Sequence, residues 1–118
     1  MARVLLAEDD GAMLDMVQRA LASDGHTVVA THDGQEALDA LNGGASFDVM
    51  LTDIHMPSVD GISLATAAVQ KLPKLRVVLM SAYTDTAIPD AIKGHISEVL
   101  AKPLALDKVR AAVKKAAG

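Results

Sequence analysis

The chain lacks cysteine and tryptophan, and it has a single phenylalanine, Phe47, and a single tyrosine, Tyr83. Without cysteine, disulfide bonds and thiolate-bound zinc are both excluded. Two separate aromatic side chains do not make a platform on which successive nucleobases could stack. The core must therefore be built from Leu, Val, Ile, Met and Ala, in a sequence that is 51% hydrophobic.

Positive charge is also scarce. The chain has 11 Lys and Arg against 15 Asp and Glu, so its formal net charge is −4. Basic residues gather only near the end of the chain, where Lys108, Lys114 and Lys115 suit the negative end of a helix dipole. Because neutralising phosphates supplies most of the affinity for nucleic acid, we expect no nucleic-acid partner. The histidines are scattered without the spacing of metal ligands.

Long hydrophobic runs are missing as well. No apolar stretch approaches the roughly 20 residues that cross a membrane. The first apolar run, 4–7, is too short for the apolar region of a signal peptide, and acids follow it at once. We therefore expect no membrane partner and a cytoplasmic location. A chain of 118 residues without a linker, repeat or low-complexity tract is expected to form one domain, residues 1–118.

Four short apolar runs each end in polar residues suited to chemistry. Unbroken runs of this kind are typical of strands buried on both faces, and the carboxyl ends of parallel strands meet at one edge of a sheet. The sequence therefore predicts one polar site made of acids, a hydroxyl and an amine. The runs are 4–7 before Glu8, Asp9 and Asp10; 49–51 before Thr52 and Asp53; 77–80 before Ser81; and 99–101 before Lys102.

Asp53 is the residue around which this site would be organised. A carboxylate at the tip of a buried strand is unfavourable unless cations or hydrogen bonds meet it. Taken alone, it is equally explained as a helix cap or a turn residue. The acids, hydroxyl and amine that end the other three runs favour the functional interpretation.

The spacing of apolar residues and turn signals predicts alternating strands and helices, hence parallel pairing with right-handed crossovers and helices on both faces. Pro89 and Gly94 interrupt the stretch between the last two strands, so its helix is expected to be short or irregular, beginning near Pro89 and ending by Gly94. The predicted strands are 3–7, 26–30, 48–53, 77–80 and 98–101, and the other helices follow Asp10, Gly34 and Gly61 and begin at Leu106.

Over its whole length the sequence resembles the receiver domain of bacterial two-component response regulators. The resemblance is carried by four pieces in order. It implies an α/β, flavodoxin-like, doubly wound sheet of five parallel strands in the order 2-1-3-4-5. The pieces are Glu8-Asp9, Asp53 within LTDIHMPSVDG, Ser81-Ala82 and Lys102-Pro103.

The resemblance also implies roles for these residues. Asp53 would be the phosphoacceptor, and Mg²⁺ would be held directly by Asp9 and Asp53, through water by Glu8, and by the backbone carbonyl of His55. Lys102 would pair with the phosphoryl charge. Two further residues would serve the phosphoryl group: Ser81 would donate its hydroxyl to it, and the small Ala82 would leave access.

Two positions depart from the family pattern. One is the stretch between Ser81 and Lys102, where the family usually has a regular fourth helix and this chain has Pro89 and Gly94. The other is the position of a common aromatic residue. Many receivers carry an aromatic residue three positions before the lysine, and here that position is Val99, so a switch based on ring rotation cannot operate. Tyr83 would either partly replace it or only cover the entrance of the site. Tyr83 and His55 would flank the phosphoryl group and tune its lifetime.

The function implied is that of a stand-alone, CheY-like response regulator and not of a turnover enzyme. It would take a phosphoryl group from a histidine kinase or a histidine phosphotransfer protein, act as a monomer or weak dimer, and bind a downstream protein through its fourth helix, fifth strand and fifth helix. An alternative is a shuttle in a phosphorelay. A metal-dependent phosphatase of the DxD type is disfavoured because His55 stands where the second acid would be, and no GxGxxG motif supports a dinucleotide-binding module.

Overall fold

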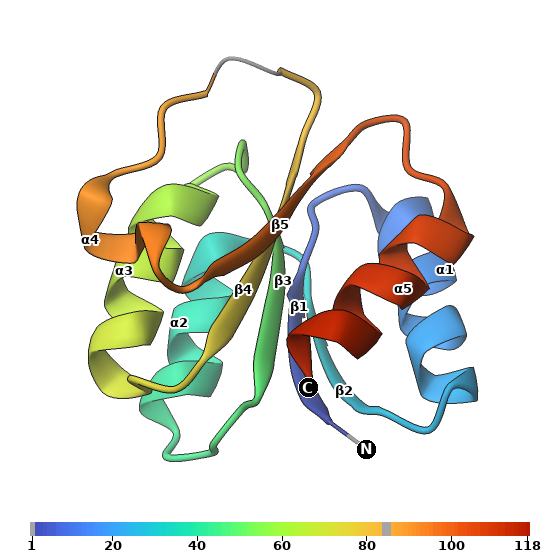
Figure 1. Cartoon of the computed structure of the whole chain (residues 1–118), viewed down its shortest axis with the longest axis horizontal. Coiled ribbons are helices and arrows are strands. Elements are labelled where there is room, and N and C mark those ends of the chain that lie inside the picture. The colour runs from blue at the N-terminus through green and yellow to red at the C-terminus, as the bar shows by residue number, and fades with distance from the viewer. Residues whose placement is uncertain (1, 84–85) are drawn as a thin grey trace.

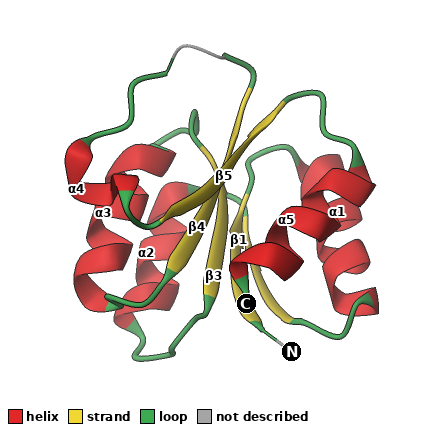
Figure 2. Ribbon diagram, in the orientation of Figure 1, coloured by secondary structure: helices red, strands yellow, loops and turns green. Residues whose placement is uncertain are grey.

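Strands and helices alternate along the chain in the computed structural model, which describes residues 2–83 and 86–118 (Figure 1). The strands form one sheet at the centre, with helices on either side (Figure 2). The elements are β1 (Arg3–Ala7), α1 (Gly11–Ser23), β2 (Thr27–Thr31), α2 (Gly34–Asn42), β3 (Val49–Asp53), α3 (Gly61–Lys71), β4 (Arg76–Ser81), α4 (Asp90–Lys93), β5 (Ile96–Ala101) and α5 (Leu106–Ala116).

All neighbouring strands pair in parallel, in the order β2-β1-β3-β4-β5. This is the predicted flavodoxin-like, doubly wound order. The central strand β3 is buried at every position, as its unbroken apolar sequence predicted. No helix in the described ranges is long and apolar enough to span a membrane.

The core has two layers, one on each face of the sheet. Alternate side chains of each strand point to opposite faces, so Leu5 and Leu79 lie in one layer and Leu6 and Met80 in the other. The first layer is completed by α2, α3 and α4, and the second by α1 and α5, which lie on opposite sides of the sheet in Figure 1. Both layers are mainly aliphatic, as the composition required.

Aspartate caps begin three of the helices that follow the carboxyl ends of the strands. The side chains of Asp10, Asp33 and Asp60 accept backbone N–H groups from the first turns of α1, α2 and α3. Gly61 starts α3 directly against the backbone of Asp53, where an added Cβ would collide with the Asp53 carbonyl oxygen. A side chain here would therefore push α3 away from the tip of β3.

Helix α4 has only four residues, between Pro89 and Gly94, as Pro89 and Gly94 predicted. The preceding residues 86–89 are not helical, while residues 84 and 85 of the same connection lie outside the described part of the chain. On the neighbouring strand β5, Val99 is 46% exposed.

Four of the five strands differ at their ends from the sequence prediction. Strand β2 begins and ends one residue later, β3 begins one residue later, β4 is one residue longer at each end, and β5 begins at Ile96 instead of residue 98. The start of β5 was missed because Ser97 is an extra residue in the ladder: Val77 pairs with Ile96, and Val78 with Glu98. This bulge reverses the alternation, so that Ile96 packs on the α3 layer and Leu100 on the α5 layer.

Candidate functional site

Lys102 joins two buried carboxylates at the carboxyl edge of the sheet. Its Nζ atom lies 2.8 Å from Oε1 of Glu8 and 2.7 Å from Oδ2 of Asp53. Glu8 is fully buried and Asp53 is 5% exposed. Glu8 precedes Lys102 by 94 positions and Asp53 precedes it by 49, yet both carboxylates contact the same ammonium group. The predicted gathering of strand ends is present, and the amine is in contact with the acids.

The position of Glu8 is fixed by backbone hydrogen bonds. Its N–H donates to the carbonyl of Thr31 at 3.1 Å, and its Oε2 atom accepts the N–H of Asp10 at 3.1 Å. The buried Thr31 hydroxyl in turn donates to the carbonyl of Leu6 at 2.8 Å. Sequence reasoning missed Thr31, which ends the edge strand β2. Its support of Glu8 depends on the pairing of β1 with β2, and no local motif indicates that pairing.

Electrostatics in the site follow from burial and from the single ammonium group. Burial raises the pKa of the Glu8 carboxyl, although the hydrogen bond from Lys102 acts in the opposite direction. Burial alone would lower the pKa of Lys102, but its hydrogen bonds to Asp53 and Glu8 outweigh that effect and raise it. Lys102 is therefore held in its charged form between the two acids.

Asp9 completes a group of three carboxylates. One oxygen from each of Glu8, Asp9 and Asp53 lies within 4.8 Å of the others, and Asp9 is exposed to solvent. A small hard cation prefers oxygen ligands and keeps several waters, so this donor set suits Mg²⁺. Asp10 is occupied differently, because its Oδ1 atom accepts the N–H of Met13 at 3.0 Å as the cap of α1.

Ser81 lies beside the acidic group but its hydroxyl is turned to its own loop. The Oγ atom donates to the carbonyl of Tyr83 at 2.8 Å and accepts the N–H of Tyr83 at 2.9 Å. The Ser81 carbonyl accepts the N–H of Lys102 at 2.8 Å. The loops after β4 and β5 are therefore tied together next to Asp53, which is one strand away through its pairing with Met80.

The side chains of His55 and Tyr83 meet at the rim of the site. Their rings form an edge-to-face pair with centroids 4.9 Å apart. Tyr83 is 61% exposed, and Ala82 beside it is exposed as well. The pair joins the loop after Asp53 to the loop after Ser81. Val99 lies instead on the exposed part of β5.

Comparison with known proteins places this arrangement in a family. Residues 4–114 match the sequence model described as the response regulator receiver domain. The chain is 36% identical over 107 residues to the response regulator receiver protein CpdR of Brucella abortus (strain 2308), with 90% of this chain and 88% of CpdR covered.

Longer relatives contain the same domain as one part. The chain is 35% identical over 114 residues to the DNA-binding transcriptional regulator NtrC of Escherichia coli (strain K12), covering 96% of this chain but only 24% of NtrC. Among solved structures, the chemotaxis response regulator CheY4 of Vibrio cholerae superposes with a TM-score of 0.84 at 25% identity, covering 98% of both chains.

Proposed function

Because the chain belongs to the response regulator receiver domain family, we propose that it accepts a phosphoryl group on Asp53 and thereby switches its binding to a downstream protein. The donor would be a histidine kinase or a histidine phosphotransfer protein. The single observation that carries this proposal is the buried Asp53 carboxylate held by Lys102 beside two more acids. The module would act as one domain in the cytoplasm and would not turn over a substrate.

The proposed transfer makes one bond and breaks one. A carboxylate oxygen of Asp53 attacks the phosphorus of a phosphohistidine, the P–N bond breaks, and the imidazole leaves with the electron pair. Lys102 already lies 2.7 Å from this carboxylate, so its ammonium group is in place to pair with the phosphoryl charge. Ser81 would have to exchange its bonds to Tyr83 for one to a phosphoryl oxygen.

Magnesium would be held by Asp9 and Asp53 directly, with Glu8 acting through water and the backbone carbonyl of His55 completing the protein ligands. The ion would supply positive charge that offsets the negative charge of the acids and of the incoming phosphoryl group. Glu8 accepts hydrogen bonds from Lys102 and from the N–H of Asp10, so both of its oxygens already have partners. The burial of Glu8 and the exposure of Asp9 agree with an outer and a direct role respectively.

Replacing Asp9 should impair phosphorylation, whereas replacing its neighbour Asp10 should not. Asp9→Asn removes a carboxylate from the group of three, so magnesium-dependent phosphorylation by acetyl phosphate should fall at least about tenfold. Asp10→Asn retains a side chain that can cap α1 and should leave labelling nearly unchanged. Intact-protein mass spectrometry over time measures both. Equal losses in the two variants would remove Asp9 from the proposed metal ligands.

His55 and Tyr83 should control the lifetime of the phosphorylated state. Their paired rings lie at the rim of the site, where bulk can exclude the water that hydrolyses the acyl phosphate. His55→Ala and Tyr83→Ala should each change the dephosphorylation rate several-fold while the extent of labelling stays the same. The double variant should show less than the product of the two effects, because the rings contact each other. Decay identical to that of the parent in all three would contradict this role.

The downstream partner is proposed to bind at α4, β5 and α5. On the β5 and α5 part of this face, a groove of about 360 Å³ is lined by the β5 residues Val99 and Ala101 and by Leu104, Ala105 and Lys108. Phosphorylation can shift an equilibrium only through its differential interaction with the two states. With Val99 in the place of an aromatic, the coupling would run through the backbone from Ser81 to Gly94.

Amide exchange should therefore report the switch. With beryllofluoride and magnesium added, the largest change in protection is expected between residues 82 and 94, a span that includes the short α4. Such a helix has little stability of its own and depends on packing. An Asp53→Asn control should show no change. If protection in the parent changes only around Asp9 and Asp53, the ligand binds without this route of signalling.

Transfer in the reverse direction separates a switch from a relay intermediate. The phosphorylated chain would be mixed with histidine phosphotransfer domains, and a terminal switch should retain its phosphoryl group. Rapid movement of the group onto a histidine would instead assign the chain to a phosphorelay. A pull-down with the beryllofluoride-bound and the bare chain identifies the partner of the switch.

A further inference from the structure

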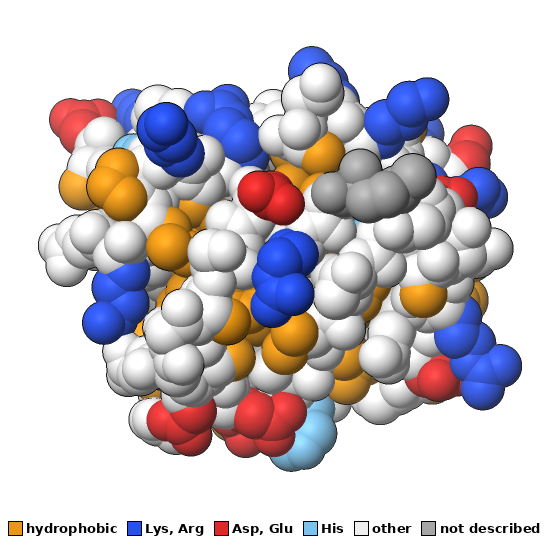
Figure 3. Space-filling model, turned by 90° about the horizontal axis from the view of Figure 1, so that it is seen from below, with side chains coloured by type: hydrophobic (Ala, Val, Ile, Leu, Met, Phe, Trp, Pro, Cys, Tyr) orange, Lys and Arg blue, Asp and Glu red, His pale blue; other side chains and the backbone are white. Residues whose placement is uncertain are grey.

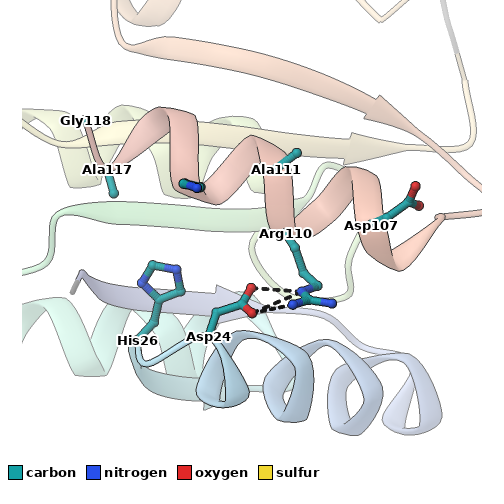
Figure 4. A pocket seen from close by; sticks show the side chains of 8 residues that line it. Asp24, His26, Asp107, Arg110, Ala111, Ala117 and Gly118 are labelled. Carbon is teal, nitrogen blue, oxygen red and sulfur yellow. Dashed lines mark hydrogen bonds and ion pairs between the residues drawn. The ribbon is translucent and has the colours of Figure 1, made fainter.

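A cavity of about 590 Å³ lies between the end of α1 and the face of α5, away from the Asp53 site. It adjoins His26, immediately before β2, and is therefore at the amino edge of the sheet, whereas Asp53 is at the carboxyl edge. Figure 4 shows α5 along one side and Asp24 and His26 on the other. Ala111 and Ala117 give the cavity an apolar side. Nothing in the phosphoryl-transfer proposal uses these residues.

A forked ion pair fixes one wall of the cavity. The Asp24 carboxylate accepts hydrogen bonds from Arg110, at 2.9 Å from Nε to Oδ2 and 2.6 Å from Nη2 to Oδ1. This pairing lowers the pKa of Asp24 and keeps it ionised. Both groups are engaged, and their charges compensate each other. The guanidinium plane is thus held in one orientation, in which it can stack against a flat ligand.

Two further donors line the same cavity. The Nδ1 atom of His26 accepts the N–H of Ala2 at 3.2 Å, so the neutral imidazole carries its proton on Nε2. Lys114 has no ion pair within 4.0 Å among residues 2–83 and 86–118. Asp107, the remaining acid, is two helical turns before Lys114 on α5. The Lys114 ammonium group is therefore free to pair with a ligand, although its charge also acts on Asp24 across the cavity.

The surface around this cavity is not broadly basic. Seen from below in Figure 3, the amino edge of the molecule carries Lys and Arg side chains scattered among acids and apolar groups, without one continuous basic patch. The positive charge of Lys114 therefore acts locally. The volume exceeds what a bare phosphate ion fills and lies within the range of about 300–1,000 Å³ typical of sites for small organic ligands.

We propose that this cavity binds a small organic anion, with its phosphate or carboxylate on Lys114 and His26 and a flat, largely apolar body between Arg110 and the alanines of α5. The charged head would accept from the Lys114 ammonium group and from Nε2 of His26. The flat body would cover the guanidinium plane of Arg110 without breaking its bonds to Asp24. The site is independent of the phosphorylation of Asp53.

Titration of the isotope-labelled chain, followed by two-dimensional amide NMR in magnesium-free buffer, tests this site. Adenosine 5′-monophosphate and benzoate serve as organic probes, and inorganic phosphate as the probe without an organic body. At least one organic probe should give saturable shifts below about 10 mM at Gly25, His26 and residues 110–117. The amide of Lys102 should not move, which separates this site from the Asp53 site.

Two neighbouring lysines provide the matched control. Lys114→Gln should weaken binding at least about tenfold, because a charge-assisted hydrogen bond is lost. Lys115→Gln removes the same charge from an exposed residue that does not line the cavity, and it should have less than a twofold effect. Ala111→Met, which fills the cavity while preserving helix propensity, should abolish binding.

Three results would overturn the proposal. Shifts that never saturate would mean that the cavity has no affinity for such anions. Equal weakening in Lys114→Gln and Lys115→Gln would reduce the effect to the general charge of α5. Binding of inorganic phosphate as tight as that of both organic probes would remove the role of the flat body.

Discussion

Asp53→Asn is expected to abolish phosphorylation of the chain. The parent should gain one phosphoryl mass when incubated with acetyl phosphate and magnesium, and the variant should gain none, a loss of more than about 10³-fold in rate because the nucleophile is removed. The amide of Asn has almost the size of the carboxylate, so the fold should survive. Circular dichroism and thermal unfolding would show this, and unfolding is expected to occur at or above the parent temperature, since one of three clustered acids is gone.

Asp90→Asn is the matched control for this experiment. Asp90 begins α4, and its side chain is almost fully exposed and pairs with Lys93. The same chemical change there should leave labelling at the parent level. A phosphoryl group that still appears on the Asp53→Asn chain would show that another residue is the acceptor, and the proposed function would fail with it.

Lys102→Met should have the largest effect on stability. The change leaves the buried Glu8 and Asp53 without their shared cation, and breaking a buried ion pair from one side destabilises by about 3 kcal/mol. Urea unfolding near neutral pH measures the change in the free energy of unfolding. Lys108→Met, at an exposed position on α5, is the control and should shift it by less than about 0.5 kcal/mol.

The pH dependence of this loss has a definite sign. Burial raises the pKa of Glu8 above its ordinary value, so the folded chain holds this proton to higher pH than the unfolded chain, and ionisation of Glu8 lowers stability as pH rises through that window. Without Lys102 the effect grows, because the hydrogen bond that opposed it is gone. The deficit of Lys102→Met should therefore shrink as pH falls from neutral to the ordinary range of a glutamate carboxyl, because the raised pKa of Glu8 lets it take up its proton before that range is reached. A deficit that is the same at both pH values would contradict the assignment to the two acids.

Lys102 also stabilises the parent through its own titration. Its pKa is raised because the bonds to Asp53 and Glu8 outweigh its burial. The stabilisation is complete below the ordinary lysine value and is lost as pH rises through the raised pKa. Magnesium should partly restore the stability of Lys102→Met, since a cation bound among the three acids replaces the missing charge.

The strand ends and their polar residues could be predicted because both signals are local. An apolar run that stops at a polar residue indicates the tip of a buried strand, and parallel topology places Glu8, Asp53, Ser81 and Lys102 at one edge whatever the packing. The strand order came from family resemblance. The short α4 followed from Pro89 and Gly94, whose backbone preferences need no tertiary partner.

Other features depend on contacts that the sequence does not display. The hydroxyl of Ser81 faces Tyr83 in this structure, and no local pattern distinguishes that orientation from one toward Asp53. Thr31 supports Glu8 only because β1 and β2 pair in a particular register. The cavity at α1 and α5 has one wall formed by the ion pair between Asp24 and Arg110. These residues are 86 positions apart and neither belongs to a motif, so the sequence does not reveal their contact.

The extra residue Ser97 in β5 bears on how copies of this chain meet one another. Strand β5 is an edge of the sheet, and a regular edge offers a row of free N–H and C=O groups onto which another strand can add. The bulge interrupts the spacing of that row at its start and increases the local twist. A second copy therefore cannot extend the sheet in register along the whole of β5. The exposed side chains of this strand can remain open to a partner without the chain assembling edge to edge into larger sheets.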